Sequence, residues 1–300
     1  QPGRTGGVVM KQTPGEKLFN VCNVLILGLV ALLCLYPFLY TLSLSLSTAV
    51  EAKRGGFHLI PREISLMSYR LVLGNPDIMA GYVNSILRTV LGTLVTVIGC
   101  AIAAYPLARK EMPHRSMITF VIVFTMLFNG GLVPTYLLVK ELGLINTVWS
   151  LVLPTMLSAF NIIIIKNFFQ ALPESLAESA RIDGAGEWRV LFQIYMPLSK
   201  PVLATVALWS AVFHWNAWFD ALLYITDDQK QVLQVFLQRI VVESSTQLME
   251  LGITDTSLVQ FTPETIKAAT IIVTILPIIC VYPFLQKYFV KGILLGGVKE

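Results

Sequence analysis

The sequence predicts an all-α membrane protein that crosses the bilayer six times. Of its 300 residues, 55% are hydrophobic and only 13% are charged, and the mean hydropathy of +0.70 is far above that of an ordinary soluble domain. A helix needs about 20 apolar residues to cross the hydrocarbon, and six uncharged runs are long enough to do so. These runs are Leu18–Val50, Thr89–Ala108, Ser116–Val139, Leu142–Ile165, Pro201–Phe219 and Ala268–Gln286.

Local features refine these runs. The first is expected to remain as an anchor, because its apolar core is longer than the roughly 7–15 residues of a signal-peptide core. In the third run, Gly130, Gly131 and Pro134 predict a kink or break. The cysteines lie in apolar runs and are interpreted as small buried hydrophobic residues rather than disulfide or metal ligands. They are Cys22, Cys34, Cys100 and Cys280.

Positive charge predicts the orientation. Most of the 22 Lys and Arg residues fall on the side that holds both termini, which is typical of a bacterial inner-membrane protein with cytoplasmic N- and C-termini. Residues 1–17 then form a cytoplasmic segment, residues 18–290 a six-helix membrane domain and residues 291–300 a cytoplasmic tail. The net charge of +4 is a topology signal, and no basic stripe with interleaved aromatic residues suggests a nucleic-acid partner.

The cytoplasmic connection, residues 171–200, contains the most informative segment. Pro173 and Glu174 favour a helix start and Gly184 favours its end, so a helix, a break and a second helix are predicted. A surface that another protein contacts and an amphipathic helix lying on the membrane both fit this chemistry. Leu176, Ala180 and Gly184 are predicted to form a helix face that another surface could approach closely. Large apolar residues such as Trp188 and Phe192 follow in the second helix.

This segment resembles the coupling loop, or EAA motif, of permeases in binding-protein-dependent ABC importers, written E-A-A, three residues, G, nine residues, I-x-L-P. The residues that match without a gap are Glu178, Ala180, Gly184, Ile194 and Pro197, while Ser179 replaces the middle alanine and Met196 the leucine. The resemblance implies a coupling helix docked in a cleft of an ATPase subunit. It assigns to this contact Glu178, Ser179, Ala180, Asp183, Gly184, Phe192 and Pro197.

Other motifs resemble the MalG-type subunits of carbohydrate importers, and look most like the LplC/YtcP-like oligosaccharide group. They are Asn84–Thr89, Ala104–Lys110, Asn129–Tyr136, His214–Phe219 and Gly296–Glu300. The resemblance implies the type I (MetI-like) permease fold, within membrane lipid, and a second, MalF-like permease subunit, two ATPase subunits and a solute-binding protein as partners. It also implies that the tail residues Gly297 and Lys299 touch the ATPase.

The chain itself is expected to do no bond chemistry. It contains no G-x-x-x-x-G-K-[ST] loop, so ATP and Mg²⁺ are expected on partner subunits and no cofactor on this chain. The scattered histidines show no catalytic or metal-site spacing. We therefore expect a non-catalytic subunit that alternates between inward-open and outward-open states as the ATPases close. An ion-coupled secondary sugar transporter is the alternative, but the mid-span carboxylates it would need are missing from the six runs.

Candidates for the substrate path are polar and aromatic residues at membrane depth, where polar groups are costly. They are Asn84, Arg88, Asn129, Asn161, His214, Trp215, Asn216, Trp218 and Asp220. Asn216 and Asp220 are expected to share one face of the fifth helix. Structural alternatives remain open: Arg88 and Asp220 could snorkel, Trp218 could anchor at the interface, and Asn84 could bond between helices.

The expected substrate is an oligosaccharide. Arg88, near the outer end of the second helix, would tolerate an acidic one, and uronate oligomers such as those of alginate are the hypothesis, with neutral oligosaccharides left open. The long outer connection, Thr226–Thr265, is acidic. It either contacts the solute-binding protein or is a solvated connector.

Overall fold

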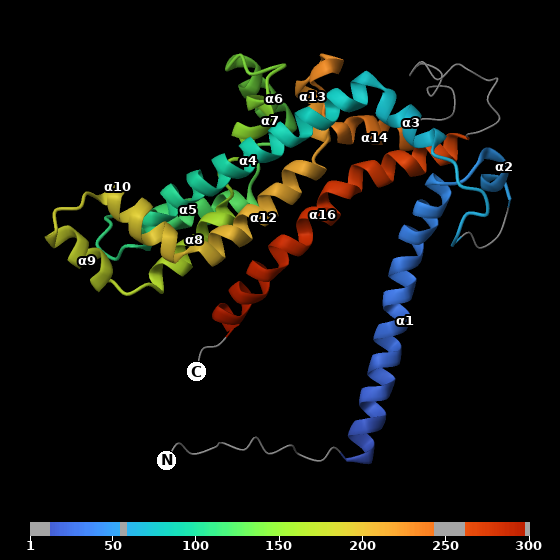
Figure 1. Ribbon diagram of the computed structural model, residues 1–300. Coiled ribbons are helices and arrows are strands. Elements are labelled where there is room, and N and C mark those ends of the chain that lie inside the picture. The colour runs from blue at the N-terminus through green and yellow to red at the C-terminus, as the bar shows by residue number, and fades with distance from the viewer. Residues whose placement is uncertain (1–12, 55–58, 243–261, 298–300) are drawn as a thin grey trace. The chain divides into compact units, whose positions relative to one another are not determined.

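A computed structural model of the chain describes residues 13–54, 59–242 and 262–297, with side chains to residue 240 in the second range and to residue 280 in the third. In these ranges the chain forms helices, and its only β-type pairing is an isolated bridge between Ser47 and Ile64. The α-helices are α1 (Pro14–Ser45), α2 (Ala49–Ala52), α3 (Met67–Gly74), α4 (Pro76–Ala108), α5 (Arg115–Leu127), α6 (Leu132–Glu141), α7 (Trp149–Val152), α8 (Ala159–Gln170), α9 (Ser175–Ile182), α10 (Glu187–Val190), α11 (Met196–Leu198), α12 (Lys200–Asn216), α13 (Phe219–Tyr224), α14 (Leu233–Val242) and α16 (Pro263–Gly297) (Figure 1). Short turns of other helix types are η1 (Leu153–Thr155), η2 (Leu191–Tyr195) and η3 (Asp228–Lys230).

Length and composition confirm the predicted all-helical membrane class. Three helices, α1, α4 and the part of α16 up to Cys280, are long and apolar enough to cross a membrane, and three bent pairs raise the number to up to six. The pairs are Arg115–Leu127 with Leu132–Glu141, bent by 112°, Trp149–Thr155 with Ala159–Gln170, bent by 55°, and Glu187–Leu198 with Lys200–Asn216, bent by 84°. Large apolar side chains on these helices are widely exposed, as expected of surfaces that meet lipid or another subunit.

The described residues divide into two compact units. The first contains the chain up to Tyr69 together with the start of α16, to Ile272. Within it α1 begins in a capping box, in which the Glu16 N–H donates to Thr13 Oγ1 at 3.3 Å and the Thr13 N–H donates to Glu16 Oε2 at 2.8 Å. Helix α1 therefore starts inside residues 1–17, the segment that the sequence predicts to be cytoplasmic.

The second unit, whose described residues are 70–242 and 273–297, holds the functional candidates that the structure describes. Its central element is α4, against which α8 and α12 pack, with α5 beside α8. Figure 1 shows α9 and α10 at one end of this bundle, and α6, α7 and α13 at the other. Small residues such as Ala101 and Ala104, both fully buried, allow the neighbouring helices to approach α4 closely.

The second span is longer than predicted. It begins at Pro76, where Asn75 Oδ1 accepts the N–H groups of Asp77 at 2.9 Å and Ile78 at 3.3 Å. The prediction began at Thr89 because Arg88 ends the uncharged run, but Arg88 is paired inside the protein with Asp220. A compensated charge does not end a helix.

Three of the predicted uncharged runs are interrupted, whereas the sequence predicted one break. The break of the third span lies at Phe128–Gly131, confirming the prediction, while Pro134 sits in the first turn of α6, where its missing N–H costs nothing. The fourth span is interrupted at Met156–Ser158, after the proline-containing η1. The fifth helix ends at Asn216, so the expectation that Asn216 and Asp220 share a helix face is wrong.

The sixth span also exceeds its predicted range: α16 starts before Ala268 and continues through residues assigned to the tail, as far as Gly297. The prediction that all four cysteines are buried is wrong for three of them. Cys100 is buried, whereas Cys22, Cys34 and Cys280 are exposed on helix surfaces. A membrane helix can present an apolar thiol to lipid or to another subunit, so an apolar run does not require burial within one chain.

Candidate functional site

The first helix of the predicted coupling loop, α9, ends in a turn that requires glycine. Gly184 has a φ of +80°, in the left-handed region that disfavours other residues. Its N–H donates to the Arg181 carbonyl at 2.9 Å, and the Ala185 N–H donates to the Ala180 carbonyl at 2.9 Å. These are the two hydrogen bonds of a Schellman motif. The predicted helix, break and helix are confirmed, because α10 begins at Glu187 after this turn.

One side of the segment from α9 to α11 is fixed to the bundle by apolar packing. The Tyr195 ring makes edge contacts with Tyr105 of α4, at 5.1 Å between centroids, and with Phe169 of α8, at 5.4 Å. Burying an apolar side chain of this size stabilises by about 1.5–3 kcal/mol. The segment is therefore mechanically joined to α4 and α8. Its residues buried in this cluster are Ala177, Val190, Leu191 and Tyr195.

A carboxylate that the sequence did not single out, Glu187, joins α10 to α9 and to the C-terminal end of α4. Its Oε2 accepts a hydrogen bond from the Tyr105 hydroxyl at 2.5 Å and lies 2.5 Å from Arg109 Nη1, and its Oε1 accepts from Arg181 Nε of α9 at 3.1 Å. Partial burial acts to raise the pKa of Glu187, but hydrogen bonds from Arg109 and Tyr105 and the charges of Arg109 and Arg181 outweigh it and lower this pKa to about 2. The partners come from separate stretches of chain, so no spacing in the sequence reveals this cluster.

The same segment has an exposed surface that contains most of the predicted coupling residues. Ala180 is the exception, since it packs partly against the core, and the predicted close-approach face is open only in part. Apolar side chains add to this surface: Ile182, which the sequence prediction missed, is 85% exposed, and Trp188 stacks on Phe192 with centroids 6.1 Å apart. Open apolar groups among charges are typical of a surface that a partner covers. The exposed predicted residues are Glu178, Ser179, Asp183, Gly184, Phe192 and Pro197.

Arg88, a substrate-path candidate, is completely buried, and so it does not snorkel. It forms an ion pair with Asp220 of α13 and donates a hydrogen bond to the Ala217 carbonyl at 2.9 Å. Because α12 ends at Asn216, this hydrogen bond also gives a partner to a backbone carbonyl at the break between α12 and α13. Because Asp220 compensates the charge of Arg88, this charge does not attract an acidic substrate in this conformation. Contact with a substrate stays a prediction that requires the pair to open.

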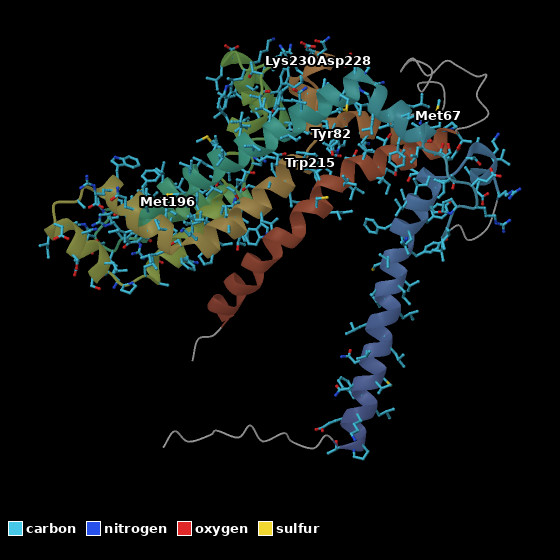
Figure 2. The ribbon with its side chains drawn as sticks, viewed as in Figure 1. Met67, Tyr82, Met196, Trp215, Asp228 and Lys230 are labelled. Atoms are coloured by element: carbon cyan, nitrogen blue, oxygen red, sulfur yellow. The ribbon has the colours of Figure 1, made fainter. Side chains whose placement is uncertain are left out.

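Apart from Asn161 and His214, the other substrate-path candidates do not converge on one place. Asn84 Nδ2 donates to the carbonyls of Gln229 at 2.8 Å and Gln231 at 3.0 Å, which fits the structural alternative for this residue. Trp215 is buried, and its Nε1 donates to the Thr274 carbonyl at 3.2 Å, beside Tyr82 (Figure 2).

Three further candidates lie near helix ends. Asn129 Oδ1 accepts the Gly131 N–H at 3.0 Å in the break of the third span. Asn216 Nδ2 donates to the Val212 carbonyl of its own helix at 2.9 Å, and Trp218 is half-buried at the α12–α13 break. Their roles in a path stay predictions. Of the two tail candidates, Gly297 ends the described part of α16 and Lys299 lies outside the described residues.

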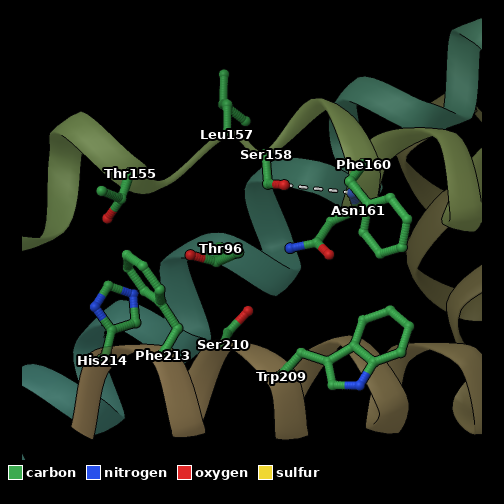
Figure 3. A pocket seen from close by; sticks show the side chains of 10 residues that line it. All are labelled: Thr96, Thr155, Leu157, Ser158, Phe160, Asn161, Trp209, Ser210, Phe213 and His214. Atoms are coloured by element: carbon green, nitrogen blue, oxygen red, sulfur yellow. Dashed lines mark hydrogen bonds between the residues drawn. The ribbon is translucent and has the colours of Figure 1, made fainter. Parts of the chain in front are cut away.

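A cavity of about 450 Å³ lies instead between α4, the fourth-span break and α12 (Figure 3). It is lined by Asn161 and His214, which the sequence singled out as polar residues at membrane depth, and by others that it did not. Except for Leu157, the missed residues carry hydroxyl or aromatic groups. Such groups are common in any span and give no signal until three helices bring them together. The polar lining residues include Thr96, Ser158, Asn161, Ser210 and His214, and Trp209 lies in the same lining.

These features are those of a helical membrane permease. The chain belongs to the family of binding-protein-dependent transport system inner membrane components, whose family model matches residues 78–294. This membership places it outside the ion-coupled secondary transporters, the alternative that the sequence left open.

Two relatives and one solved structure match nearly the whole chain. It is 44% identical over 293 residues to Protein LplC of Bacillus subtilis (strain 168), covering 97% of this chain and 98% of that protein. It is 43% identical to the polygalacturonan/rhamnogalacturonan transport system permease protein YtcP of the same organism, covering 95% and 99%. Among solved structures, a chain of a bacterial ABC transporter involved in the import of the acidic polysaccharide alginate is 33% identical, with a TM-score of 0.86 and coverage of 93% and 99%.

Proposed function

We propose that this chain is a transmembrane permease subunit of an ATP-binding-cassette importer that takes up an oligosaccharide. The relatives support this substrate class, since YtcP is named for polygalacturonan and rhamnogalacturonan and the matching structure for the acidic polysaccharide alginate, and all three polymers contain uronate rings. A solute-binding protein delivers the substrate, a second, MalF-like permease subunit completes the path, and two ATPase subunits bind ATP and Mg²⁺. Both termini lie on the cytoplasmic side of the inner membrane.

The observation that carries the proposal is the two-sided character of the α9–α11 segment. One side is fixed to α4 and α8 by buried aromatic packing and by Glu187, while the other presents Glu178, Asp183, Ile182 and Trp188. A rigid connection transmits force, and an open surface receives it. Closure of an ATPase dimer therefore moves α4 and α8 as a unit and changes which side of the membrane the path opens to.

Charge reversal on the open surface tests this function. We expect Glu178→Arg to abolish ATP-driven uptake of alginate or galacturonate oligomers into proteoliposomes, because it alters the docking surface without removing a buried contact. Glu141→Arg reverses another exposed carboxylate, at the end of α6; it is the matched control and is expected to transport normally. Wild-type uptake by the Glu178→Arg complex would refute the assignment of the coupling surface.

A further inference from the structure

The cavity in the second unit is built around an interruption of the fourth span. Ser158 is the N-cap of α8, and its Oγ accepts the Asn161 N–H at 3.5 Å. The first turn of a helix leaves further N–H groups unpaired, and this end carries partial positive charge. Ser158, Phe160 and Asn161 all line the cavity, so the N-terminus of α8 opens onto it. Broken membrane helices use such ends to hold anionic groups of a substrate.

Buried polar atoms without a partner surround the same cavity. Thr96, Ser210 and His214 are at most 5% exposed, yet Thr96 Oγ1, Ser210 Oγ and His214 Nδ1 make no hydrogen bond in the described part of the chain. An unsatisfied buried group costs about 1–3 kcal/mol. They come from two helices, α4 and α12, and a ligand in the cavity would supply the missing partners. Figure 3 shows the Ser210 hydroxyl and the Asn161 amide directed into the space.

The walls between these polar groups are aromatic. Phe160 and Trp209 lie with ring centroids 5.6 Å apart, and Phe213 lies beside the His214 ring at 5.3 Å. No lining residue is Lys, Arg, Asp or Glu, so α8 supplies the positive potential and nothing in the lining opposes it. Aromatic walls with a few polar groups, in a volume of roughly 300–1,000 Å³, are typical of sites for small molecules. A sugar ring has the matching chemistry, with apolar faces and a rim of hydroxyl groups.

The position of His214 depends on a close approach to α4. A Cβ atom built at Gly92 would collide with Nε2, Cδ2 and Cε1 of the His214 ring. The absence of a side chain at Gly92 therefore makes room for the ring beside the cavity.

We propose that this cavity is a subsite for one uronate ring of the substrate, an inference that rests on the proposed function. The carboxylate of the ring lies at the N-terminus of α8, beside the Asn161 amide. The ring hydroxyls bond to Thr96, Ser210 and His214, and an apolar face of the ring lies against Trp209. The subsite thus recognises an acidic sugar without a lysine or arginine.

Equilibrium binding measures this subsite directly. Tritiated trigalacturonate and its fully methyl-esterified form are titrated, without solute-binding protein, onto the purified transporter complex in nanodiscs. We expect Thr96→Val and Ser210→Ala each to weaken trigalacturonate binding about three- to tenfold, the loss of one hydrogen bond. Thr93→Val is the matched control, because its Oγ1 is also buried and unpaired on α4 but does not line the cavity.

A negative charge at position 161 separates recognition of the carboxylate from a non-specific loss of binding. Aspartate is favourable in the first turn of a helix, so Asn161→Asp preserves α8 while repelling an anion. We expect it to weaken trigalacturonate binding at least tenfold more than binding of the methyl ester. Asn161→Leu removes the amide but adds no charge, so it should discriminate between the two probes less than Asn161→Asp does.

The outcomes distinguish failure of the subsite from failure of the proposed function. If Thr96→Val and Ser210→Ala bind like Thr93→Val, or if Asn161→Asp affects both probes equally, the subsite is refuted, while uptake by the wild-type complex still supports the proposed function. If the wild-type complex, with its ATPase and solute-binding protein, takes up no oligosaccharide, the proposed function fails and the subsite with it. Uptake of neutral raffinose but of no uronate oligomer would overturn the inference that the subsite binds an acidic sugar ring.

Discussion

Replacing Gly184 by alanine isolates the backbone geometry of the coupling loop from its contacts. A Cβ at this position meets nothing within 4 Å, so the substitution creates no clash. Its cost comes from the φ of +80°, which is unfavourable for alanine by about 1–2 kcal/mol. Part of this cost is offset, since alanine also restricts the unfolded segment by about 0.4–1 kcal/mol. A net loss of about 1 kcal/mol makes local opening of the α9 end roughly fivefold more frequent.

Hydrogen exchange of the amides of residues 176–185 in the purified complex measures this opening. We expect about fivefold faster exchange in Gly184→Ala and a smaller change in Gly184→Asn, because asparagine tolerates left-handed backbone. Gly186→Ser is the control, since Gly186 has an ordinary φ of −70° and serine is favoured at the start of a helix such as α10. Equal exchange in Gly184→Ala and Gly186→Ser would refute the role given to the glycine turn.

Three further predictions concern the supports of the site. Glu187→Gln removes a charge held by Arg109, Arg181 and Tyr105, and because this carboxylate is half exposed we expect the α9–α11 segment to lose about 1 kcal/mol at pH 7, measured by hydrogen exchange. The pKa of Glu187 is about 2, below its ordinary 4.5, so its contribution to stability is present above pH 4.5 and is lost as the pH falls toward 2. The exchange rates of the wild type should therefore approach those of the variant in this window. A variant with the same acid sensitivity as wild type would contradict the prediction. Gly92→Ala forces the His214 ring aside at a cost of about 1–3 kcal/mol, which should appear as a lower thermal midpoint of the complex and weaker trigalacturonate binding, whereas Gly28→Ala, with open space around its Cβ, should change neither. Trp215→Phe leaves the Thr274 carbonyl without its indole donor and should destabilise the second unit by about 1–3 kcal/mol in a denaturation assay, and an unchanged midpoint would show that this bond contributes nothing.

The sequence predicts features that depend on local chemistry. The apolar runs predict spanning helices because lipid contact needs no partner within the chain. The glycine at 184 predicts the end of α9 because its left-handed turn is a property of a few adjacent residues. The EAA-like spacing places the coupling residues on one segment, most of which is exposed.

The features that the sequence missed depend on distant contacts. Arg88 seemed to end the second span because nothing in its neighbourhood shows that Asp220, 132 residues away, compensates its charge. The face expected of Asn216 and Asp220 required an uninterrupted helix, but α12 ends before Trp218. Glu187 finds its partners only when α4 and α9 meet, and the cavity arises only when α4, α8 and α12 surround it.

The most direct test of the central claim is whether an ATPase binds the α9–α11 surface. The chain is purified by affinity from its native membranes in mild detergent, and the co-purifying proteins are identified by mass spectrometry and assayed for ATP hydrolysis. We predict that the wild type retains a subunit with a G-x-x-x-x-G-K-[ST] loop and ATPase activity, together with a second permease. Ile182→Asp, which changes only an 85% exposed side chain, should lose the ATPase but keep the second permease. Recovery of the same ATPase by Ile182→Asp, or of none by the wild type, would contradict the account.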